Sequence, residues 1–394
     1  MFTPDRRFEP ADQRQPQAQR RLREDPFDVV RRITREIGPR RAASLGEAKA
    51  AGYVGGRLRR AGMRVWIDPF VVPQPLAADG AVVAALALLG GLLSVWQPLP
   101  SLLLILWSWL FAMLPLLRGG APVFARPGES QSIVATLAAR EQPLRARLVL
   151  IAPLDSPAAL NPAARLLMGE DARLRRIVLA GALLALSIAR LFFATPALQI
   201  AALALLAWLV ALAICEIVVL SRAASVGAVS HAGALATLLA AADTLEQARN
   251  VEVWAVAVGA GESGDGVVDL LRRYPFDPQS TSFVVLHGIG RGSLSLLVAD
   301  GWPRAEAADA ALLQQVQRAA ADGRIALALG ASRSRTLTAA LRRAGLRAVT
   351  VCCLGRDGRV PLRATTGDTL DMVEPEVLEQ GHQLLVALVR GMDR

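Results

Sequence analysis

Hydrophobic residues concentrate in two long stretches of the chain, each broken once near its middle by a short polar or proline-containing turn. The first stretch covers 80–117 and is broken by Gln-Pro-Leu-Pro at 97–100. The second covers 177–220 and is broken by Ala-Thr-Pro at 194–196. Each apolar run has about 17 to 24 residues, close to the roughly 20 that cross the hydrocarbon core of a bilayer. The pattern therefore predicts two transmembrane helical hairpins, with two buried hairpins in a soluble core as the alternative.

Two charged residues interrupt the second hydrophobic stretch. Arg190 lies near the interhelical turn, and Glu216 lies near the opposite end of the hairpin. Charged side chains are costly in lipid, but long side chains near helix ends can reach the interface. We expect these two side chains to extend toward opposite interfaces rather than to pair with each other.

The sequence outside the hairpins alternates short apolar strands with amphipathic helices in three segments, 24–76, 119–175 and 222–394. Strands are predicted at 64–72, 132–137, 147–152, 251–258, 282–286, 325–329 and 348–352, and helices at 27–37, 44–61, 231–245, 267–274, 307–320, 336–344 and 375–392. This alternation predicts an α/β fold with a mixed, largely parallel sheet sandwiched by helices. No segment is complete alone, so we expect one α/β domain interrupted twice by the hairpins. Residues 1–23, polar and rich in arginine, are expected to form a disordered basic tail.

Charge is distributed unevenly around the hairpins. The chain has 44 Lys and Arg residues against 34 Asp and Glu residues, a net charge of +10. Arginines flank the hydrophilic ends of the hairpins, whereas the turns at 97–100 and 194–196 carry no charge. By the positive-inside bias we expect a multi-pass protein of the cell membrane with its soluble part in the cytoplasm. The lipid bilayer is then a partner of the basic surface. No aromatic-plus-basic module indicates a nucleic-acid partner.

A glycine-rich loop follows the predicted strand at 251–258. Gly259, Gly261 and Gly264 match the spacing G-x-G-x-x-G between a strand and a helix, as in dinucleotide-binding loops. Such a site also needs an acidic residue about 20 positions later, at the end of the next strand. That strand ends in Leu-His-Gly at 286–288, so the loop predicts no dinucleotide cofactor.

Short motifs outside the hairpins occur in the order typical of one enzyme family. They are Gly38-Pro39-Arg40, Ala43-Ser44, Gly46-Glu47, Gly62, IAPLDS at 151–156, GAVSHAGALATLLAAADTL at 227–245, VGAGESG at 258–264, VVLHGIGRG at 284–292, AGLRAV at 344–349 and TTGDTLDMVEPEVL at 365–378. On these motifs the chain resembles the zinc aminopeptidases of metallopeptidase family 28. The resemblance implies a zinc-exopeptidase-like fold with two zinc ions at the C-terminal edge of the strands. The hairpins are not part of it.

The resemblance also implies five zinc ligands and a glutamate base, most of which this chain replaces. The slots of the first histidine, the bridging aspartate, the base, the next aspartate and the last histidine hold Pro153, Ser230, Gly261, His287 and Ala364. Only Glu262 keeps the residue type that the family has at its position. Hydrolysis by two metals needs the bridging carboxylate and the base, so we expect no catalytic residues.

A remnant metal site is the alternative. Glu262, His287 and His231 form a His/His/Glu set, the number of ligands that a catalytic zinc takes when one position stays open for water. The resemblance places Glu262 and His287 on different metals, and His231, one residue beyond its slot, is expected to point elsewhere. We therefore expect no metal and no cofactor. Asp155 and Asp368 are expected to serve only the local turns in which they lie.

The sequence thus predicts a membrane-anchored, catalytically inactive zinc-aminopeptidase-like protein that acts as a binding or assembly module, with another membrane or cytoplasmic protein as its partner. One alternative is an active membrane-bound aminopeptidase with a mononuclear zinc site at the three residues named above. Another is a sensor that binds a ligand or a lipid head group in the emptied cleft.

Overall fold

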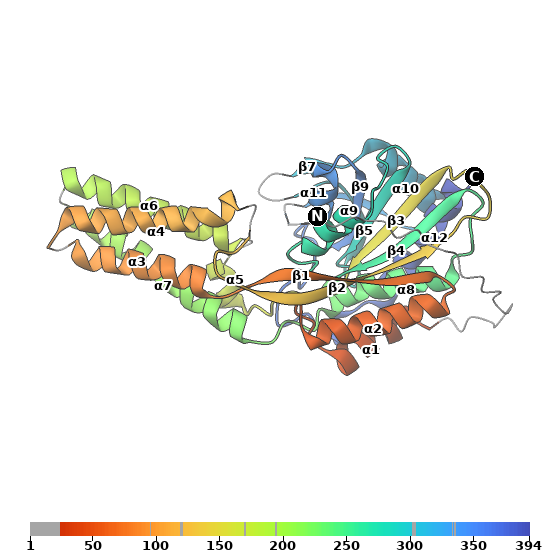
Figure 1. Cartoon of the computed structure of the whole chain (residues 1–394), viewed down its shortest axis with the longest axis horizontal. Coiled ribbons are helices and arrows are strands. Elements are labelled where there is room, and N and C mark those ends of the chain that lie inside the picture. The colour runs from red at the N-terminus through yellow and green to blue at the C-terminus, as the bar shows by residue number, and fades with distance from the viewer. Residues whose placement is uncertain are drawn as a thin grey trace, which may run out of the picture.

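The structure is a computed structural model that describes residues 24–394, apart from 95, 119–120, 169–170, 194, 302–304, 333 and 335. It consists of an α/β part and a bundle of four apolar helices that projects from one end of it (Figure 1). The predicted basic tail, 1–23, lies outside the described residues.

A nine-stranded mixed sheet forms the centre of the α/β part. Its order is β1 (Arg64–Pro75), β2 (Ala125–Leu137), β4 (Val251–Val258), β3 (Ala146–Pro153), β5 (Thr281–His287), β9 (Arg347–Leu354), β6 (Ser293–Asp300) and β7 (Glu306–Ala307), while β8 (Ala328–Ser332) pairs with β6. The strands β4, β3, β5 and β9 are parallel to one another, whereas β2 and β6 run antiparallel to their neighbours in this group. The parallel strands are nearly continuous apolar runs because helices cover both faces of the sheet.

Helices pack against both faces of this sheet. One face carries α1 (Pro26–Arg32), α2 (Leu45–Arg60), α8 (Gly233–Thr244), α10 (Ala310–Asp322) and α12 (Pro375–Met392), and the other carries α9 (Asp265–Arg273) and α11 (Thr338–Arg343). The predicted fold class, a mixed and largely parallel sheet sandwiched by helices, is confirmed. The sequence analysis missed β6 and the short helix α5 (Pro162–Met168).

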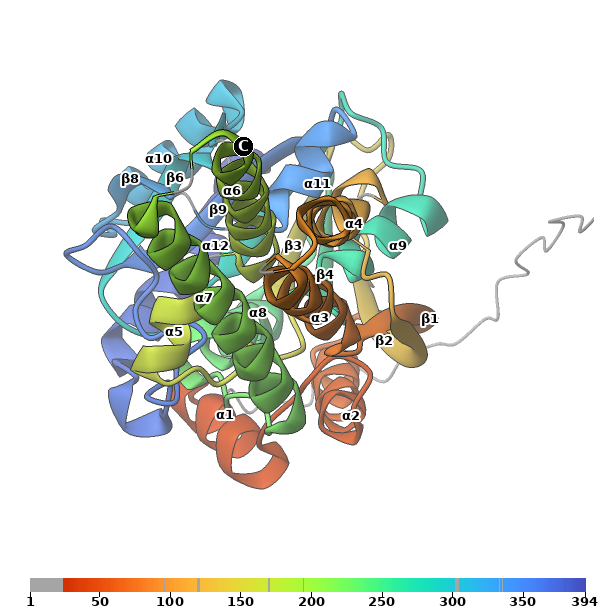
Figure 2. The same cartoon turned by 90° about the vertical axis from the view of Figure 1, so that its left-hand side faces the viewer.

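The four apolar helices are α3 (Ala78–Leu93), α4 (Pro98–Leu117), α6 (Ala172–Phe192) and α7 (Pro196–Ser221). They lie side by side in front of the sheet when the molecule is viewed from the bundle end (Figure 2) and share one hydrophobic core. Two of them, α4 and α7, are long and apolar enough to cross a membrane, which by itself is weak evidence that they do so. In their most apolar windows only 28% and 33% of the residues are buried, whereas a core helix of a soluble protein is mostly buried.

An ion pair joins the two helices of the second hairpin. Arg176 on α6 and Glu216 on α7 lie 2.9 Å apart, and their side chains are only 9% and 10% exposed. The sequence analysis considered only Arg190 as a partner of Glu216 and did not anticipate that Arg176, one turn inside α6, lies within its reach. Gly80 lets α3 approach the pair, since a Cβ atom at this position would lie 2.1 Å from a Glu216 oxygen.

We predict that breaking this pair destabilises the bundle more than replacing it. Glu216→Gln or Arg176→Met leaves one buried charge without its partner and is expected to cost about 3–5 kcal/mol. The double variant Arg176→Met/Glu216→Leu should be more stable than either single variant, because an apolar pair of similar volume carries no uncompensated charge. Thermal unfolding in detergent measures the order of stability of these variants. Arg190→Met is the control, since no carboxylate within the described ranges pairs with Arg190. A double variant less stable than both singles would contradict the prediction.

Candidate functional site

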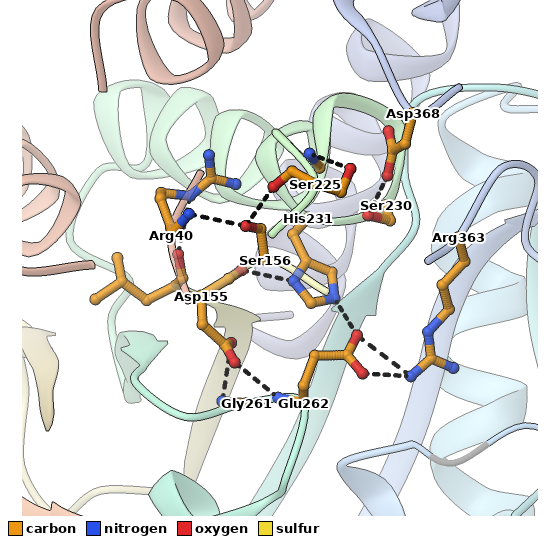
Figure 3. Close-up of polar contacts among 12 residues, drawn as sticks. Arg40, Asp155, Ser156, Ser225, Ser230, His231, Gly261, Glu262, Arg363 and Asp368 are labelled. Carbon is orange, nitrogen blue, oxygen red and sulfur yellow. Dashed lines mark hydrogen bonds and ion pairs between the residues drawn. The ribbon is translucent and has the colours of Figure 1, made fainter. Parts of the chain in front are cut away.

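The candidate site lies where the parallel strands end. Asp155 follows β3, Gly261 and Glu262 follow β4, and His287 is the last residue of β5. Parallel strands place their carboxyl ends at one edge of a sheet, which is where α/β proteins build their sites. A π-helical turn at Ala228–Ala232 brings His231 to the same edge from the start of α8 (Figure 3).

Asp155 fixes the loop that carries Glu262. Its carboxylate accepts hydrogen bonds from the backbone amides of Gly261, at 2.9 Å, and Glu262, at 3.1 Å. Its carbonyl oxygen lies 2.6 Å from Nδ1 of His231. The expectation that Asp155 only caps its own turn is wrong, because its side chain reaches the neighbouring strand's loop. Burial raises the pKa of this carboxyl group, and the nearby Glu262 adds to the rise while His231 opposes it.

Glu262 lies between the imidazole of His231 and the guanidinium of Arg363. One carboxylate oxygen is 3.1 Å from Nε2 of His231, and the other is 3.1 Å from the Arg363 guanidinium (Figure 3). Burial alone would raise the pKa of Glu262, but Arg363, His231 and His287 hold it well below its ordinary value. Glu262 is therefore an ionised carboxylate in an ion-pair network.

His231 points into this network and not elsewhere, which corrects the expectation from the sequence. Gly227 has a left-handed backbone, with φ at 61°, and starts the turn that directs the ring toward Asp155. Both ring nitrogens face oxygen acceptors, a carbonyl and a carboxylate. The Nδ1 contact has hydrogen-bond geometry, whereas Nε2 lies near the Glu262 oxygen without it.

His287 packs edge-on against His231, with ring centroids 5.3 Å apart. Its side chain is 6% exposed, and its Nε2 atom has no hydrogen-bond partner among the residues that the structure describes. Burial, Arg363 and His231 together lower the pKa of His287 well below its ordinary value. The three residues of the predicted remnant set, Glu262, His231 and His287, thus lie together.

Ser230 and Pro153 occupy two other positions of the implied zinc site. The Ser230 hydroxyl donates to Asp368 at 2.5 Å, and the same carboxylate accepts from the amide of Val229 at 2.6 Å. Asp368 therefore anchors the start of the α8 segment and does more than serve its own turn. Pro153, at the end of β3, has no donor atom to offer.

Arg363 was missed by the sequence analysis. Its neighbours Leu362 and Ala364 both have left-handed backbones, with φ at 57° and 55°, in the turn that presents the guanidinium. The signal that could have found it is its position directly before Ala364, where the resemblance implies a histidine ligand. A cationic side chain at this position can pair with the carboxylate of Glu262.

A zinc ion does not fit these residues. The positive charge that a metal would supply beside Glu262 comes from Arg363, and both nitrogens of His231 already face oxygen atoms. Ser230 and Asp368 bind each other. Within the described part of the chain, no group of three or more His, Cys, Asp or Glu side chains could hold a metal ion.

A second buried carboxylate, that of Glu47, binds the backbone of the same loop. Glu47 accepts from the amide of Ala260 at 2.8 Å, from the amide of Ala43 at 2.6 Å and from the Ser130 hydroxyl at 2.9 Å. Ser44, the N-cap of α2, accepts from the amide of Glu47 at 3.3 Å, which is one half of a capping box. The glutamate thus links the start of α2 to the site loop.

The second hairpin is attached beside this site. Arg40 is completely buried and donates to the carbonyls of Gly38, Leu154 and Val226 at 3.0–3.1 Å. The Ser156 hydroxyl lies between the backbone of Arg40 and the carbonyl of Ser225, just beyond α7. The end of the hairpin is therefore bonded to the segment that contains Asp155.

Comparisons with known proteins place the fold among zinc exopeptidases. The chain is similar to a zinc aminopeptidase from Bacillus subtilis, with 12% identity over 93% of both chains and a TM-score of 0.56. It is also similar to an aminopeptidase from Aneurinibacillus sp. strain AM-1, with 13% identity over 94% and 93% of the chains and a TM-score of 0.57. A glutaminyl cyclase from Bacteroides thetaiotaomicron, bound to N-acetylhistamine, gives 11% identity over 93% and 96% and a TM-score of 0.54. No protein-family model and no curated protein matches the sequence. At these identities the likeness shows an aminopeptidase-like fold alone.

We predict that Glu47 makes stability depend on pH. Burial raises the pKa of Glu47 from its ordinary 4.5 to about 7, so between these values the native state holds a proton that the unfolded chain has released. The free energy of unfolding should therefore fall as the pH rises from 4.5 to 7, by roughly 3 kcal/mol from this group. Asp155 and Asp368, whose pKa values are also raised by burial, act in the same direction.

Unfolding curves across this pH range test the contribution of Glu47. Glu47→Gln should flatten the dependence, and Glu129→Gln, an exposed position on the neighbouring strand β2, should leave it unchanged. Equal slopes for the Glu47 variant and the unaltered protein would contradict the assignment.

Proposed function

We propose that the chain is a membrane-anchored, zinc-aminopeptidase-like protein that does not hydrolyse peptides and acts as a binding or assembly module. The observation on which this depends is the network in which Glu262 pairs with Arg363 and contacts His231. The residue that would need a metal partner is already satisfied by protein groups. The cleft is therefore built to be stable without an ion.

The position of the general base supports the same conclusion. Gly261 has no side chain, and a Cβ atom added there would lie 2.8 Å from Cβ of Pro153 and 3.0 Å from the Asp155 carboxylate. A glutamate at 261 would thus clash with the residue that replaced the first histidine ligand. Proton transfer by a positioned base typically contributes about 10²–10⁴-fold to the rate, and here this contribution is lost.

An active hydrolase is the second candidate, because Glu262, His231 and His287 lie together. It would need the Arg363 guanidinium to leave the carboxylate before an ion could enter. The third candidate, a sensor that binds a ligand in the cleft, is compatible with the proposed function.

The apolar surface of the bundle supports anchoring in a bilayer. Large hydrophobic side chains point outward along all four helices, among them Leu88, Leu92, Leu103, Trp107, Ile188, Ile200, Leu203, Trp208, Ile214 and Ile217. Water would solvate this surface poorly, whereas lipid chains would cover it. The arginines that flank the α/β end of the bundle, including Arg118, Arg173, Arg175 and Arg222, favour a cytoplasmic α/β part.

We predict that purified protein contains no stoichiometric zinc and has no aminopeptidase activity. Elemental analysis of the protein after exposure to zinc and extensive dialysis measures the first, and release of amino acids from peptide substrates measures the second. Gly261→Glu should not create activity, because the added side chain meets Pro153 and the metal ligands are still absent. Stoichiometric zinc, together with turnover that Glu262→Ala abolishes, would replace this proposal with the hydrolase.

We predict a topology in which both hairpin turns lie outside the cell. Single cysteines introduced as Gln97→Cys, at the start of α4, and Thr195→Cys, at the start of α7, should react with a membrane-impermeant maleimide in intact cells. Asp322→Cys, on the exposed end of α10, should react only after the cells are opened. The reverse pattern would invert the orientation, and reaction of all three in soluble extracts would contradict membrane anchoring.

A further inference from the structure

We infer that the cleft is a binding site for a small carboxylate, and that the side chain of Glu262 is a built-in occupant which such a ligand displaces. This inference rests on the proposed function, in which the cleft binds and does not hydrolyse. It assigns a ligand class to the emptied site.

The contacts of Glu262 are those of a bound carboxylate ligand. One oxygen faces Nε2 of His231 at 3.1 Å, and Arg363 lies 3.1 and 3.4 Å from the two oxygens (Figure 3). Both contacts come from one guanidinium nitrogen, Nη2, so Arg363 supplies one charge-assisted donor that the two oxygens share. If the Glu262 side chain turns away, these groups are left without their carboxylate.

His287 gives an independent indication that a ligand belongs here. Its side chain is only 6% exposed, and its Nε2 atom has no hydrogen-bond partner in the described structure. Leaving a buried nitrogen unpaired costs free energy, so such an atom calls for an explanation. A carboxylate that enters deeper than the glutamate side chain can accept a hydrogen bond from this ring, which packs against His231.

The loop permits this exchange without refolding. Its backbone is held by Asp155 on the amides of Gly261 and Glu262 and by Glu47 on the amide of Ala260. The Glu262 side chain is nevertheless 29% exposed, so it borders solvent. Rotation about its side-chain bonds is enough to vacate the site while the backbone stays in place.

Competition from the Glu262 side chain determines which variant binds a free carboxylate most tightly. A tethered competitor acts at an effective concentration of the order of mM or higher, so the unaltered protein should bind a free carboxylate weakly. Glu262→Ala removes the competitor and keeps the donors. Its apparent affinity for acetate should be roughly ten-fold higher or more. Glu262→Gln, which keeps the shape but not the charge, should lie between the two.

The experiment measures the shift of the thermal unfolding midpoint with acetate concentration, using the full chain in detergent with a chelator and constant ionic strength. Acetamide is the neutral control ligand, and inorganic phosphate tests whether a different anion is preferred. Glu246→Ala, an exposed position 86% accessible to solvent, is the control variant with the same change in net charge. Glu262→Ala/Arg363→Gln should lose the acetate response.

Acetate stabilisation that is strongest in Glu262→Ala, absent with acetamide and lost without Arg363 supports the inference. If neither Glu262→Ala nor Glu262→Gln responds to acetate more than Glu246→Ala, or if phosphate alone stabilises them, the inference is wrong. The zinc content of the same samples separates this outcome from failure of the proposed function. A zinc-free protein that ignores acetate overturns only the inference, whereas stoichiometric zinc overturns the proposed function.

Discussion

A largely buried carboxylate at the edge of the sheet needs a positively charged partner, and the structure of the site depends on which group supplies that charge. Glu262 finds its partners in Arg363 and His231, each 3.1 Å away. In a metal-dependent relative of this fold the partner would be a cation bound from solution, and here it is part of the chain. An ionised carboxylate without such a partner would cost several kcal/mol, so the guanidinium stabilises the loop as well as filling the site.

The substitutions in the cleft depend on one another. Pro153 and Gly261 are packed closely enough that a side chain at 261 would clash with the proline. Asp155, which in the family resemblance would orient a histidine ligand, binds the amides of the loop instead. Ser230 and Asp368 satisfy each other. A side chain at position 261 would therefore require a change at position 153 as well, so these two positions are coupled.

Local patterns predicted most of the fold but little of the site. The limits of β4 and α12 follow from apolar runs and from a proline at the first helical position, both of which are local signals. Residue type alone predicts that Pro153 and Gly261 offer neither a metal ligand nor a base. The partners of His231 and Arg363 could not, because they depend on left-handed turns at Gly227, Leu362 and Ala364 that no periodicity encodes. The pairing of Arg176 with Glu216 was missed for a similar reason, since it requires the relative rotation of two helices.

Polar contacts at the end of α7 join the second hairpin to the segment beside the candidate site. Arg40 is completely buried and donates to Val226, just beyond α7, and to Leu154, next to Asp155. Arg41 donates to the last carbonyls of α7, at Val219 and Leu220, which otherwise have no partner within the helix. Removing the hairpin would leave the Arg41 guanidinium without its acceptors on α7, whereas the acceptors of Arg40 all lie outside the hairpin. The end of α7 is therefore fixed to Arg41, and Arg40 fixes the segment after α7 to the end of β3, where Asp155 binds the loop of Glu262.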